Sequence, residues 1–436
     1  MAGAAGIVQR STTQHAERST RNAARSVVLV LLCGSLFVGG TARAGNDGPA
    51  EGQLSCASLR SMARIYMASG GYEKAQPFLQ RALDLAQGQN DSDLEICACM
   101  LDLAYLYKSQ GKLTEAERMC RSGLELQEKI YRENHPYVAY TLRILSEIYR
   151  GQARYQEAQS TLQRAIAIMQ GARPDDDEQS APFNVDMARL LVERGDLAGA
   201  QAYFDKAVSP IENSFGPEHL YTTKVLTSLA GLYVLQKRYA DAERLTSRIL
   251  PVQEEVYGPD HYLLVPVWLL ISQIDQAKGD LPSAKVLLDK SRKAVENQTD
   301  CGPLMKAEVL VRLGEFHLLS KDYARAGEVL QKVLNSLENT DGAPRHLAAT
   351  ALNDTARVCI NQGRYTEAET LCHRALDILK TIFDEYHPSV ADVLETQVQL
   401  HRQMGRTTEA AALEQQAQEI RARQHVAYTP MAKALP

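Results

Sequence analysis

Four histidines recur at multiples of 42 residues, a spacing at which metal-binding side chains could repeat along a chain. They are His135, His219, His261 and His387. Imidazole is a common metal ligand, yet equivalent loops of stacked helices lie ~10 Å or more apart, whereas metal–nitrogen bonds are ~2 Å long. Two of the histidines directly precede a proline, which suits the first position of a helix. We therefore predict that all four hydrogen-bond a loop to the helix that follows it.

Cysteines and clustered acids are the other residues that could carry chemistry. Cys97-x-Cys99 has no second pair at zinc spacing, so no metal site is predicted there. Cys359 and Cys372 are expected to face each other across a pair of helices, either as small core residues or as a disulfide in an oxidising compartment. Residues 175–178 are consecutive acids without the glycine and spacing of an EF-hand, which favours a solvated loop.

Motifs of catalytic or cofactor-binding sites do not occur in the sequence. It contains no glycine-rich phosphate loop, no Gly-x-Ser-x-Gly elbow and no His-Glu-x-x-His helix. Catalysis needs polar groups that converge in one pocket, and a uniform repeat with no inserted domain offers no obvious place for one. We predict that the protein is not an enzyme, holds no cofactor and has no small-molecule substrate.

The elements that would position a binding site come from one repeating unit. A pair of positions, usually tyrosine or leucine followed three residues later by alanine, occurs nine times, with a first step of 41 residues and seven steps of 42. A period of this length indicates a solenoid of stacked supersecondary units. The pairs are Tyr72/Ala75, Leu113/Ala116, Tyr155/Ala158, Leu197/Ala200, Tyr239/Ala242, Leu281/Ala284, Tyr323/Ala326, Tyr365/Ala368 and Thr407/Ala410.

Each unit reads as two antiparallel helices. Residues 347–361 carry apolar side chains at helical spacing, Gly363 follows as a helix stop, and a second helical run begins two residues later. So short a turn makes the two helices antiparallel neighbours. Their close approach requires small side chains where the axes cross, and the sequence offers Ala356, Ala368 and Ala375. A single hairpin cannot bury its outer apolar stripe, whereas stacked neighbours cover one another.

This pattern resembles the tetratricopeptide repeat, with its small-residue positions and Gly-x-Tyr turn. The 42-residue period and the segments 257–261 (Tyr-Gly-Pro-Asp-His) and 386–391 (Tyr-His-Pro-Ser-Val-Ala) look like the kinesin-light-chain type of repeat. The resemblance covers about Ser55 to Arg423. It implies an all-α fold, a right-handed superhelical solenoid of about nine antiparallel helix hairpins, and a role in binding protein partners. The Lys/Asn carboxylate clamp of the family's chaperone-binding members has no match here.

The N-terminal residues 1–44 read as a secretory signal peptide. Four arginines precede the apolar run 27–38, and Ala42-Arg43-Ala44 follows as a small-x-small cleavage site. The alternative is an uncleaved membrane anchor, although the apolar run is shorter than the ~20 residues of a spanning helix. The predicted divisions are a flexible lead at 45–54, nine repeats at 55–423 and a disordered tail at 424–436. We expect an exported protein, periplasmic or secreted if bacterial, that contacts a membrane only if the segment is uncleaved.

Charge limits the class of partner. Cleavage after Ala44 removes five arginines and one glutamate, so that the net charge falls from −5 to −9. General nucleic-acid binding needs a basic surface, and we therefore predict a protein or peptide partner and no nucleic acid.

The first helix of each hairpin is expected to line the groove of the solenoid. Basic residues there are interleaved with acids, which is also typical of a merely solvated face, and two leucines could either anchor a partner or pack between helices. The candidate groove residues are Arg60, Arg64, Lys108, Arg143, Arg150, Arg189, Leu269 and Leu270. The predicted function is a scaffold that binds a peptide or protein in this groove. The alternative, suggested by seven cysteines after cleavage, is a structural spacer that self-associates.

Overall fold

A computed structural model of the chain describes residues 55–68, 71–88, 92–172, 177–296, 298, 301–338 and 345–426. The predicted signal peptide, the lead at 45–54 and the residues after Val426 lie outside the described residues. The chain divides into two compact units, residues 1–90 and residues 91–436.

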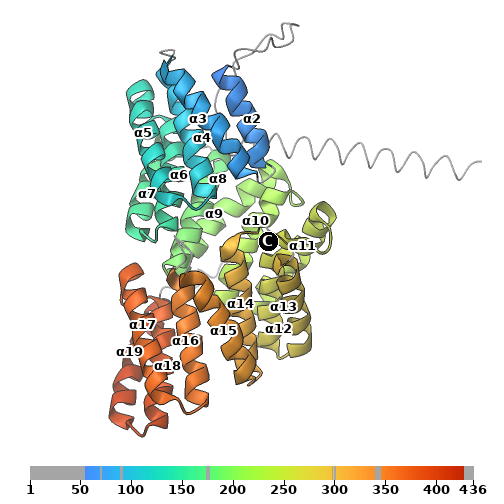
Figure 1. The fold of residues 1–436 in the computed structure, drawn as a ribbon, viewed down its shortest axis with the longest axis vertical. Helices are drawn as coiled ribbons and strands as arrows, with labels where there is room; N and C mark the ends of the chain where they lie inside the picture. Colours follow the sequence, from blue (N-terminus) through green and yellow to red (C-terminus); the bar gives the residue numbers. More distant parts are fainter. Residues whose placement is uncertain are drawn as a thin grey trace, which may run out of the picture. The chain divides into compact units, whose positions relative to one another are not determined.

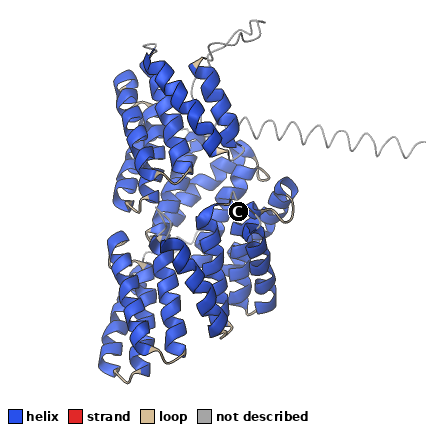
Figure 2. Ribbon diagram, viewed as in Figure 1, coloured by secondary structure: helices blue, strands red, loops and turns tan. Residues whose placement is uncertain are grey.

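Eighteen α-helices lie within the described residues, and no strand occurs there (Figure 1, Figure 2). Unit 1 contains α2 (Cys56–Ala68) and α3 (Tyr72–Gly88), which pack against each other. In unit 2 the first helices of successive hairpins are α4 (Asp93–Ser109), α6 (Pro136–Gly151), α8 (Asp177–Glu193), α10 (Leu220–Leu235), α12 (Val265–Lys278), α14 (Gly302–Leu319), α16 (Arg345–Asn361) and α18 (Pro388–Gln403). The second helices are α5 (Leu113–Tyr131), α7 (Tyr155–Ala172), α9 (Leu197–Phe215), α11 (Tyr239–Tyr257), α13 (Leu281–Glu296), α15 (Tyr323–Glu338), α17 (Tyr365–Ile382) and α19 (Thr407–Val426). A 3-10 turn, η1 (Tyr262–Leu264), precedes α12.

The hairpins pack as the repeat predicts. Each first helix packs on the second helix of its own hairpin, and within unit 2 each second helix then packs on the next first helix. The small residues lie at the crossings, because Ala356, Ala368 and Ala375 are completely buried. At Gly314 a Cβ atom would come within 2.6 Å of the Leu330 side chain, so this hairpin has no room even for alanine. The predicted all-α solenoid of antiparallel helix hairpins is confirmed for the described residues.

The first helices line the inner side of unit 2. Successive first helices also contact one another along the whole row from α4 to α18, whereas the second helices form no comparable contacts with each other within the described residues. Stacked hairpins whose first helices approach more closely than their second helices curve toward the first helices. We call the exposed side of this row the inner face.

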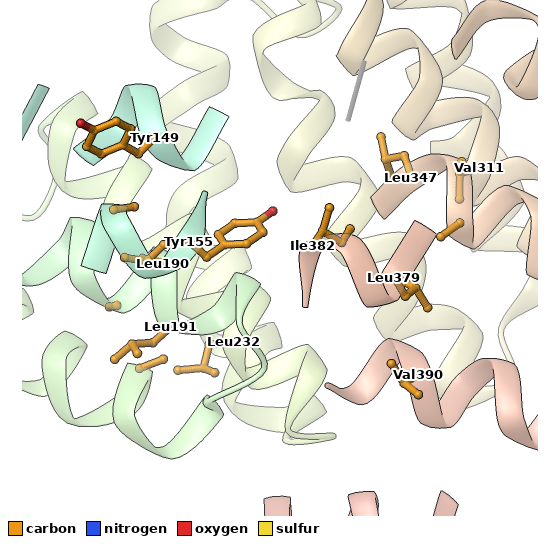
Figure 3. Close-up of a cluster of buried hydrophobic side chains, with 14 of the residues drawn as sticks. Tyr149, Tyr155, Leu190, Leu191, Leu232, Val311, Leu347, Leu379, Ile382 and Val390 are labelled. Carbon is orange, nitrogen blue, oxygen red and sulfur yellow. The ribbon is translucent and has the colours of Figure 1, made fainter. Parts of the chain in front are cut away.

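Buried side chains of unit 2 form one large cluster with smaller ones beside it. The large cluster runs from Ala104 to Leu232 and resumes from Ala307 to Ile420, while residues from Leu226 of α10 to Phe316 of α14 supply the smaller clusters. Figure 3 shows Tyr155 of α7 and Ile382 of α17 turned toward each other within the large cluster. The two stretches of the large cluster therefore meet directly at these helices.

The turn inside each hairpin of unit 2 places one residue in the left-handed region. Glycine occupies this position in the turns before α5, α9, α13, α17 and α19, with φ between +74° and +85°. Non-glycine residues stand there in three turns, at Ala153 (φ +59°), Lys237 (φ +60°) and Lys321 (φ +59°). A side chain in this conformation costs roughly 1 kcal/mol or more, so these three turns are locally strained.

Ala153→Gly is expected to raise the free energy of unfolding by about 0.5–1 kcal/mol. Glycine removes the left-handed penalty, and its greater freedom in the unfolded chain offsets part of the gain. Urea unfolding followed by circular dichroism measures the change, with Lys237→Gly as an independent repeat at an equivalent turn. A loss of stability in both variants would contradict this account.

The four repeated histidines cap helices, as predicted. The Nδ1 atoms of His135 and His219 accept hydrogen bonds from the backbone N–H groups two residues later, at 3.2 and 3.1 Å. His261 and His387 do the same, at 3.2 and 3.1 Å. An acceptor at this position satisfies one of the free N–H groups of the first turn, and it requires a neutral imidazole.

The prediction of a solvated loop is wrong for the second half of the acidic run at 175–178. Asp177 and Glu178 are exposed and form the first turn of α8, where a negative charge is favoured by the helix dipole. Asp175 and Asp176 lie outside the described residues.

Candidate binding face of the first helices

Three of the predicted groove residues hold successive first helices together. Lys108 of α4 pairs with Glu147 of α6, and Arg143 of α6 pairs with Asp186 of α8. Each carboxylate lies on the next first helix, so these ion pairs cross the boundaries between repeats. A third pair crosses the same boundary as the second: the Arg150 guanidinium of α6 donates to Glu193 of α8 at 2.7 Å. We call these three pairs the ion-pair row.

The ion-pair row neutralises much of the basic character expected for the inner face. Burial alone would raise the pKa of Glu147, but the Lys108 ammonium and the Arg143 guanidinium outweigh it and lower this pKa to about 2. Burial raises the pKa of Glu193, and the pairing with Arg150 only partly opposes it. Removing one member of such a pair would leave its partner with an uncompensated charge, so these arginines are first of all structural.

Among the described residues of α8 and α10, Arg189 and Lys224 are cations of the inner face that are not fully engaged by a carboxylate. The Arg189 Nε atom donates to the Ser228 hydroxyl at 3.0 Å, and its nearest carboxylate is Asp186 at 3.7 Å, which Arg143 already engages. Lys224 of α10 is exposed and makes no ion pair with any described residue. Partial desolvation of the ammonium by surrounding protein atoms, followed by the positive charge of Arg189, lowers the pKa of Lys224. Lys224 therefore has no carboxylate among the described residues, and Arg189 shares Asp186 with Arg143.

A second charged group lies on the inner face of α14 and α16. Arg312 pairs with Glu315 on α14, and Arg357 donates to Asp354 on α16 at 3.0 Å. The second carboxylate oxygen of Asp354 is buried and has no hydrogen-bond partner, as is also true of the Asn353 amide oxygen. Burial, followed by the negative charge of Glu315, raises the pKa of Asp354 to about 7.

Sequence reasoning did not single out Asp354, although a signal was present. Asp354 stands four repeats after Asp186, at the equivalent position of a first helix. Comparing equivalent positions across repeats would therefore have marked both aspartates as inner-face residues.

Asp354→Asn is expected to remove a dependence of stability on pH. A folded-state pKa raised from 3.8 to about 7 makes the wild type lose stability as the pH rises through this range, since the buried carboxyl must ionise. Urea unfolding at pH 5 and pH 8 measures the difference between the variant and the wild type. The exposed Asp377→Asn is the control, and equal pH slopes for Asp354→Asn and the wild type would contradict the expectation.

The other predicted groove residues lie elsewhere or are less exposed. Leu269 is 4% exposed and packs in the core around Trp268, so the packing alternative is correct for this residue. Leu270 is half-buried and lies near Gly231 of α10. Arg60 and Arg64 are half-buried on α2 of unit 1.

The seven cysteines after the predicted leader are buried. Cys359 and Cys372 form no disulfide in the structure, and neither do the other five cysteines. Burial is the main cause that raises the pKa of Cys372 to about 12, so this thiol is unreactive while the helices stay packed.

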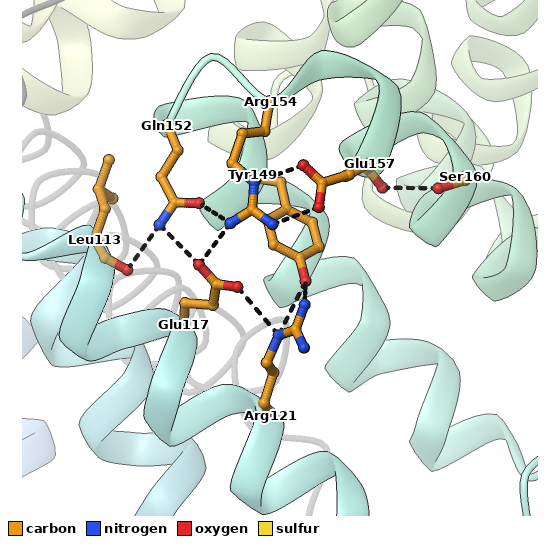
Figure 4. Close-up of polar contacts among 8 residues, drawn as sticks. All are labelled: Leu113, Glu117, Arg121, Tyr149, Gln152, Arg154, Glu157 and Ser160. Atoms are coloured by element: carbon orange, nitrogen blue, oxygen red, sulfur yellow. Dashed lines mark hydrogen bonds and ion pairs between the residues drawn. The ribbon is translucent and has the colours of Figure 1, made fainter.

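A polar network away from the inner face connects the second and third hairpins (Figure 4). Glu117 of α5 accepts from Arg154 at 2.7 Å and from Gln152 at 3.0 Å, and it pairs with Arg121 at 3.1 Å. The Arg154 guanidinium also lies 4.3 Å from the centre of the Tyr149 ring. The hydrogen-bonding and charged groups of the two hairpins pair with one another across the repeat boundary. The network therefore stabilises the packing of the second hairpin on the third.

Neither metal-binding nor membrane-spanning features are found in the described part of the chain. No group of three or more His, Cys, Asp or Glu residues there could hold a metal ion. No helix there has both the length and the apolar character needed to cross a membrane.

Comparison with known proteins supports the repeat assignment. The sequence matches the family model of the MalT-like TPR region over residues 44–290 and that of the tetratricopeptide repeat over residues 356–423. Protein KINESIN LIGHT CHAIN-RELATED 2 of Arabidopsis thaliana is 22% identical over 399 residues, covering 81% of this chain and 60% of that protein. The HTH-type transcriptional regulator MalT of Yersinia pestis (strain Pestoides F) is 22% identical over 353 residues, covering 76% of this chain and 37% of that protein. The chain therefore spans about three fifths or less of the length of these relatives.

A solved structure shows the same fold. A Rap protein complexed with competence and sporulation factor superposes with a TM-score of 0.59 at 13% identity, covering 86% of this chain and 99% of that chain. At this identity the likeness concerns the arrangement of the helices.

Proposed function

Because this chain belongs to the tetratricopeptide-repeat proteins of the MalT-like type, we propose that it is a scaffold that binds an acidic segment of a protein partner on the inner face of unit 2. Tetratricopeptide-repeat arrays generally act as protein-interaction scaffolds and are typically not enzymes. The relatives of the kinesin-light-chain type agree with the resemblance drawn from the 42-residue period.

The proposal depends on the two available cations. Arg189 and Lys224 lie on neighbouring first helices. Among the described residues, no carboxylate forms an ion pair with Lys224. A carboxylate brought by a partner would relieve the repulsion between the two cations and would form charge-assisted hydrogen bonds with both. The flanking ion-pair row presents its own carboxylates beside this point, so that an isolated acidic group is favoured over a long acidic run.

Binding of short labelled peptides tests the proposal. We expect a peptide with one Asp-Glu pair to bind unit 2 in a fluorescence anisotropy assay, and a peptide of equal length with Lys-Lys at the same place to bind far more weakly. Raising the salt concentration should weaken the binding. The double variant Arg189→Glu, Lys224→Glu should lose roughly tenfold or more in affinity.

The matched control reverses two cations on a second helix. Arg325→Glu and Lys332→Glu on α15 change the net charge by the same amount at side chains that are 67% and 61% exposed. This control should bind the acidic peptide like the wild type. Equal losses in the two double variants, or no preference for the acidic peptide, would refute the proposed contact.

The spacer alternative finds no comparable support. Self-association through disulfides would need an exposed thiol, and all seven cysteines among the described residues are buried.

A further inference from the structure

The segment that joins α17 to α18 makes a contact far from its neighbours in sequence. This segment, residues 383–388, packs against the ends of α7 and α8, and we call it the closing segment. The Phe383 ring stacks on the Tyr155 ring of α7, with centroids 5.3 Å apart and an interplanar angle of 18°. On its other side Phe383 stacks on the imidazole of His387, at 3.6 Å and 2°. Three rings from two distant repeats therefore form one stack.

His387 connects two helices through its two ring nitrogens. Its Nδ1 atom accepts from the Ser389 N–H at the start of α18, so the ring proton of the neutral imidazole is on Nε2. The Nε2 atom lies 2.9 Å from the carbonyl oxygen of Glu193, the last residue of α8, and donates to it. This carbonyl has no partner within its own helix. One side chain thus caps the start of one helix and the end of another, 194 residues away.

The contact is fitted around a glycine. Gly195 follows α8 with φ +78°, and a Cβ atom on it would lie 2.3 Å from Cδ of Pro388. Beside it Arg194 and Asp384 form an ion pair at 4.0 Å. At the equivalent turn before α17, a Cβ atom on Gly363 (φ +77°) would meet nothing within 4 Å. Close packing at this position is therefore a property of the closing contact and not of the turn.

The closing segment completes a circuit of packed helices. Helices α8 to α18 are joined in sequence, each packed on the next, and the closing segment returns the chain to the end of α8. The polar and ring contacts that close this circuit include one hydrogen bond, one ring stack, one ion pair and one proline–glycine contact, beside the apolar packing of Tyr155 and Ile382. The buried cluster continues across this contact through Tyr155 and Ile382, while each hairpin on either side also buries the alanines at its own helix crossing, such as Ala158, Ala200 and Ala368.

We propose that the closing segment is a releasable latch, and that unit 2 exchanges between the closed form and an open form in which residues 383–388 leave α7 and α8. In the closed form the circuit encloses the inner face of the helices between α8 and α18. Release widens the entry to this face while every hairpin stays intact. Glu193 belongs to both the latch and the ion-pair row, since its carboxylate pairs with Arg150 and its backbone carbonyl accepts a hydrogen bond from His387.

The latch requires no partner protein, so the experiment that tests it is independent of peptide binding.

His387→Asn separates the latch from the helix cap. Asparagine is one of the best N-terminal caps, so α18 keeps its first turn, but it places no donor where Nε2 reaches the Glu193 carbonyl. His219→Asn is the matched control, because the side-chain hydrogen bond of His219 is the local helix cap, to Tyr221. Spin labels on Gln156→Cys and Thr381→Cys, both exposed in the wild type, report the distance across the contact by double electron–electron resonance in the full chain. The seven native cysteines among the described residues are buried, so labelling there favours the introduced ones.

We expect a short, narrow distance distribution for the labelled wild type and for His219→Asn. His387→Asn should increase the population at longer distance by about fivefold relative to the closed form, as expected for the loss of one hydrogen bond. Circular dichroism should show the same helix content for all three. A His387→Asn distribution that superimposes on the wild type, or equal shifts for the two variants, would overturn the proposal.

A second pair of variants decides the question if His387→Asn does not fold. Gly195→Ala disturbs the contact with Pro388, and Gly363→Ala introduces the same side chain at the same φ where no neighbour is close. The labels should report opening in Gly195→Ala alone. Opening in neither variant, or in both, would overturn the latch.

Discussion

Gly195→Ala is expected to lower the free energy of unfolding of unit 2 by about 2–3 kcal/mol, whereas Gly363→Ala should lower it by about 1 kcal/mol. Both residues have a left-handed φ, +78° and +77°, and an L-residue there costs roughly 1 kcal/mol or more. At Gly195 alone the new Cβ atom would overlap the Pro388 ring. Relieving this overlap either strains the packing, at about 1–3 kcal/mol, or gives up the contacts of the closing segment.

Urea unfolding followed by far-ultraviolet circular dichroism measures both losses. Gly111→Ala is a second control, since Gly111 has φ +77° and no atom within 4 Å of its Cβ position. The two controls should agree with each other. If Gly195→Ala loses no more free energy of unfolding than the two controls, Pro388 is not in close contact with this turn in solution.

Acid is expected to weaken the closing contact at His387. Burial lowers the pKa of His387 from 6.5 to about 4, because the folded protein favours the neutral imidazole. The hydrogen bond to the Glu193 carbonyl and the Asp384 carboxylate favour the charged ring, while His346 and Arg194 oppose it. Because the pKa of His387 is lower in the folded state than in the unfolded state, the neutral ring contributes its full stability to the folded protein above pH 6.5. This contribution to the free energy of unfolding decreases as the pH falls from 6.5 to 4, by a total of about 3 kcal/mol, and does not change further below pH 4.

The difference in stability between the wild type and His387→Asn measures this contribution. Asp354 and His219 titrate in both proteins, so their effects cancel in the difference. We expect the advantage of the wild type to shrink between pH 6.5 and pH 4, and the long-distance population of the spin-labelled wild type to rise over the same range. A difference that does not change with pH would mean that His387 does not titrate as a buried neutral imidazole.

The fold could be predicted from the sequence because its determinants are local. Two helices can cross closely only where alanine or glycine stands at the crossing point. These small residues recur every 42 residues along the chain, so each hairpin has the same crossing. The histidine caps follow from the same locality, since each bond spans two residues. Leu269 shows the limit, because its exposure depends on how closely α12 approaches its neighbours, which periodicity does not specify.

The binding face could be predicted only in part. Sequence placed Lys108, Arg143 and Arg150 on the correct helices, but their partners lie one repeat away, and the register between stacked helices depends on the packing of both. The lack of an ion-pair partner for Lys224 could not be predicted either, because it also depends on the register between neighbouring repeats. The closing segment was beyond prediction, because small rotations between successive hairpins add up before residues 383–388 reach α8.

The bond between His387 and Glu193 has a consequence for how the array comes apart. In a repeat protein each unit touches only its neighbours, so the ends fray independently and the middle can melt alone. A contact that spans 194 residues exists only while every hairpin between its ends is folded. If any one of these hairpins unfolds, the contact is lost as well. Partly unfolded states are therefore less stable than they would be in an array without the contact. Unit 2 should therefore denature in a more concerted transition than an open array of the same hairpins.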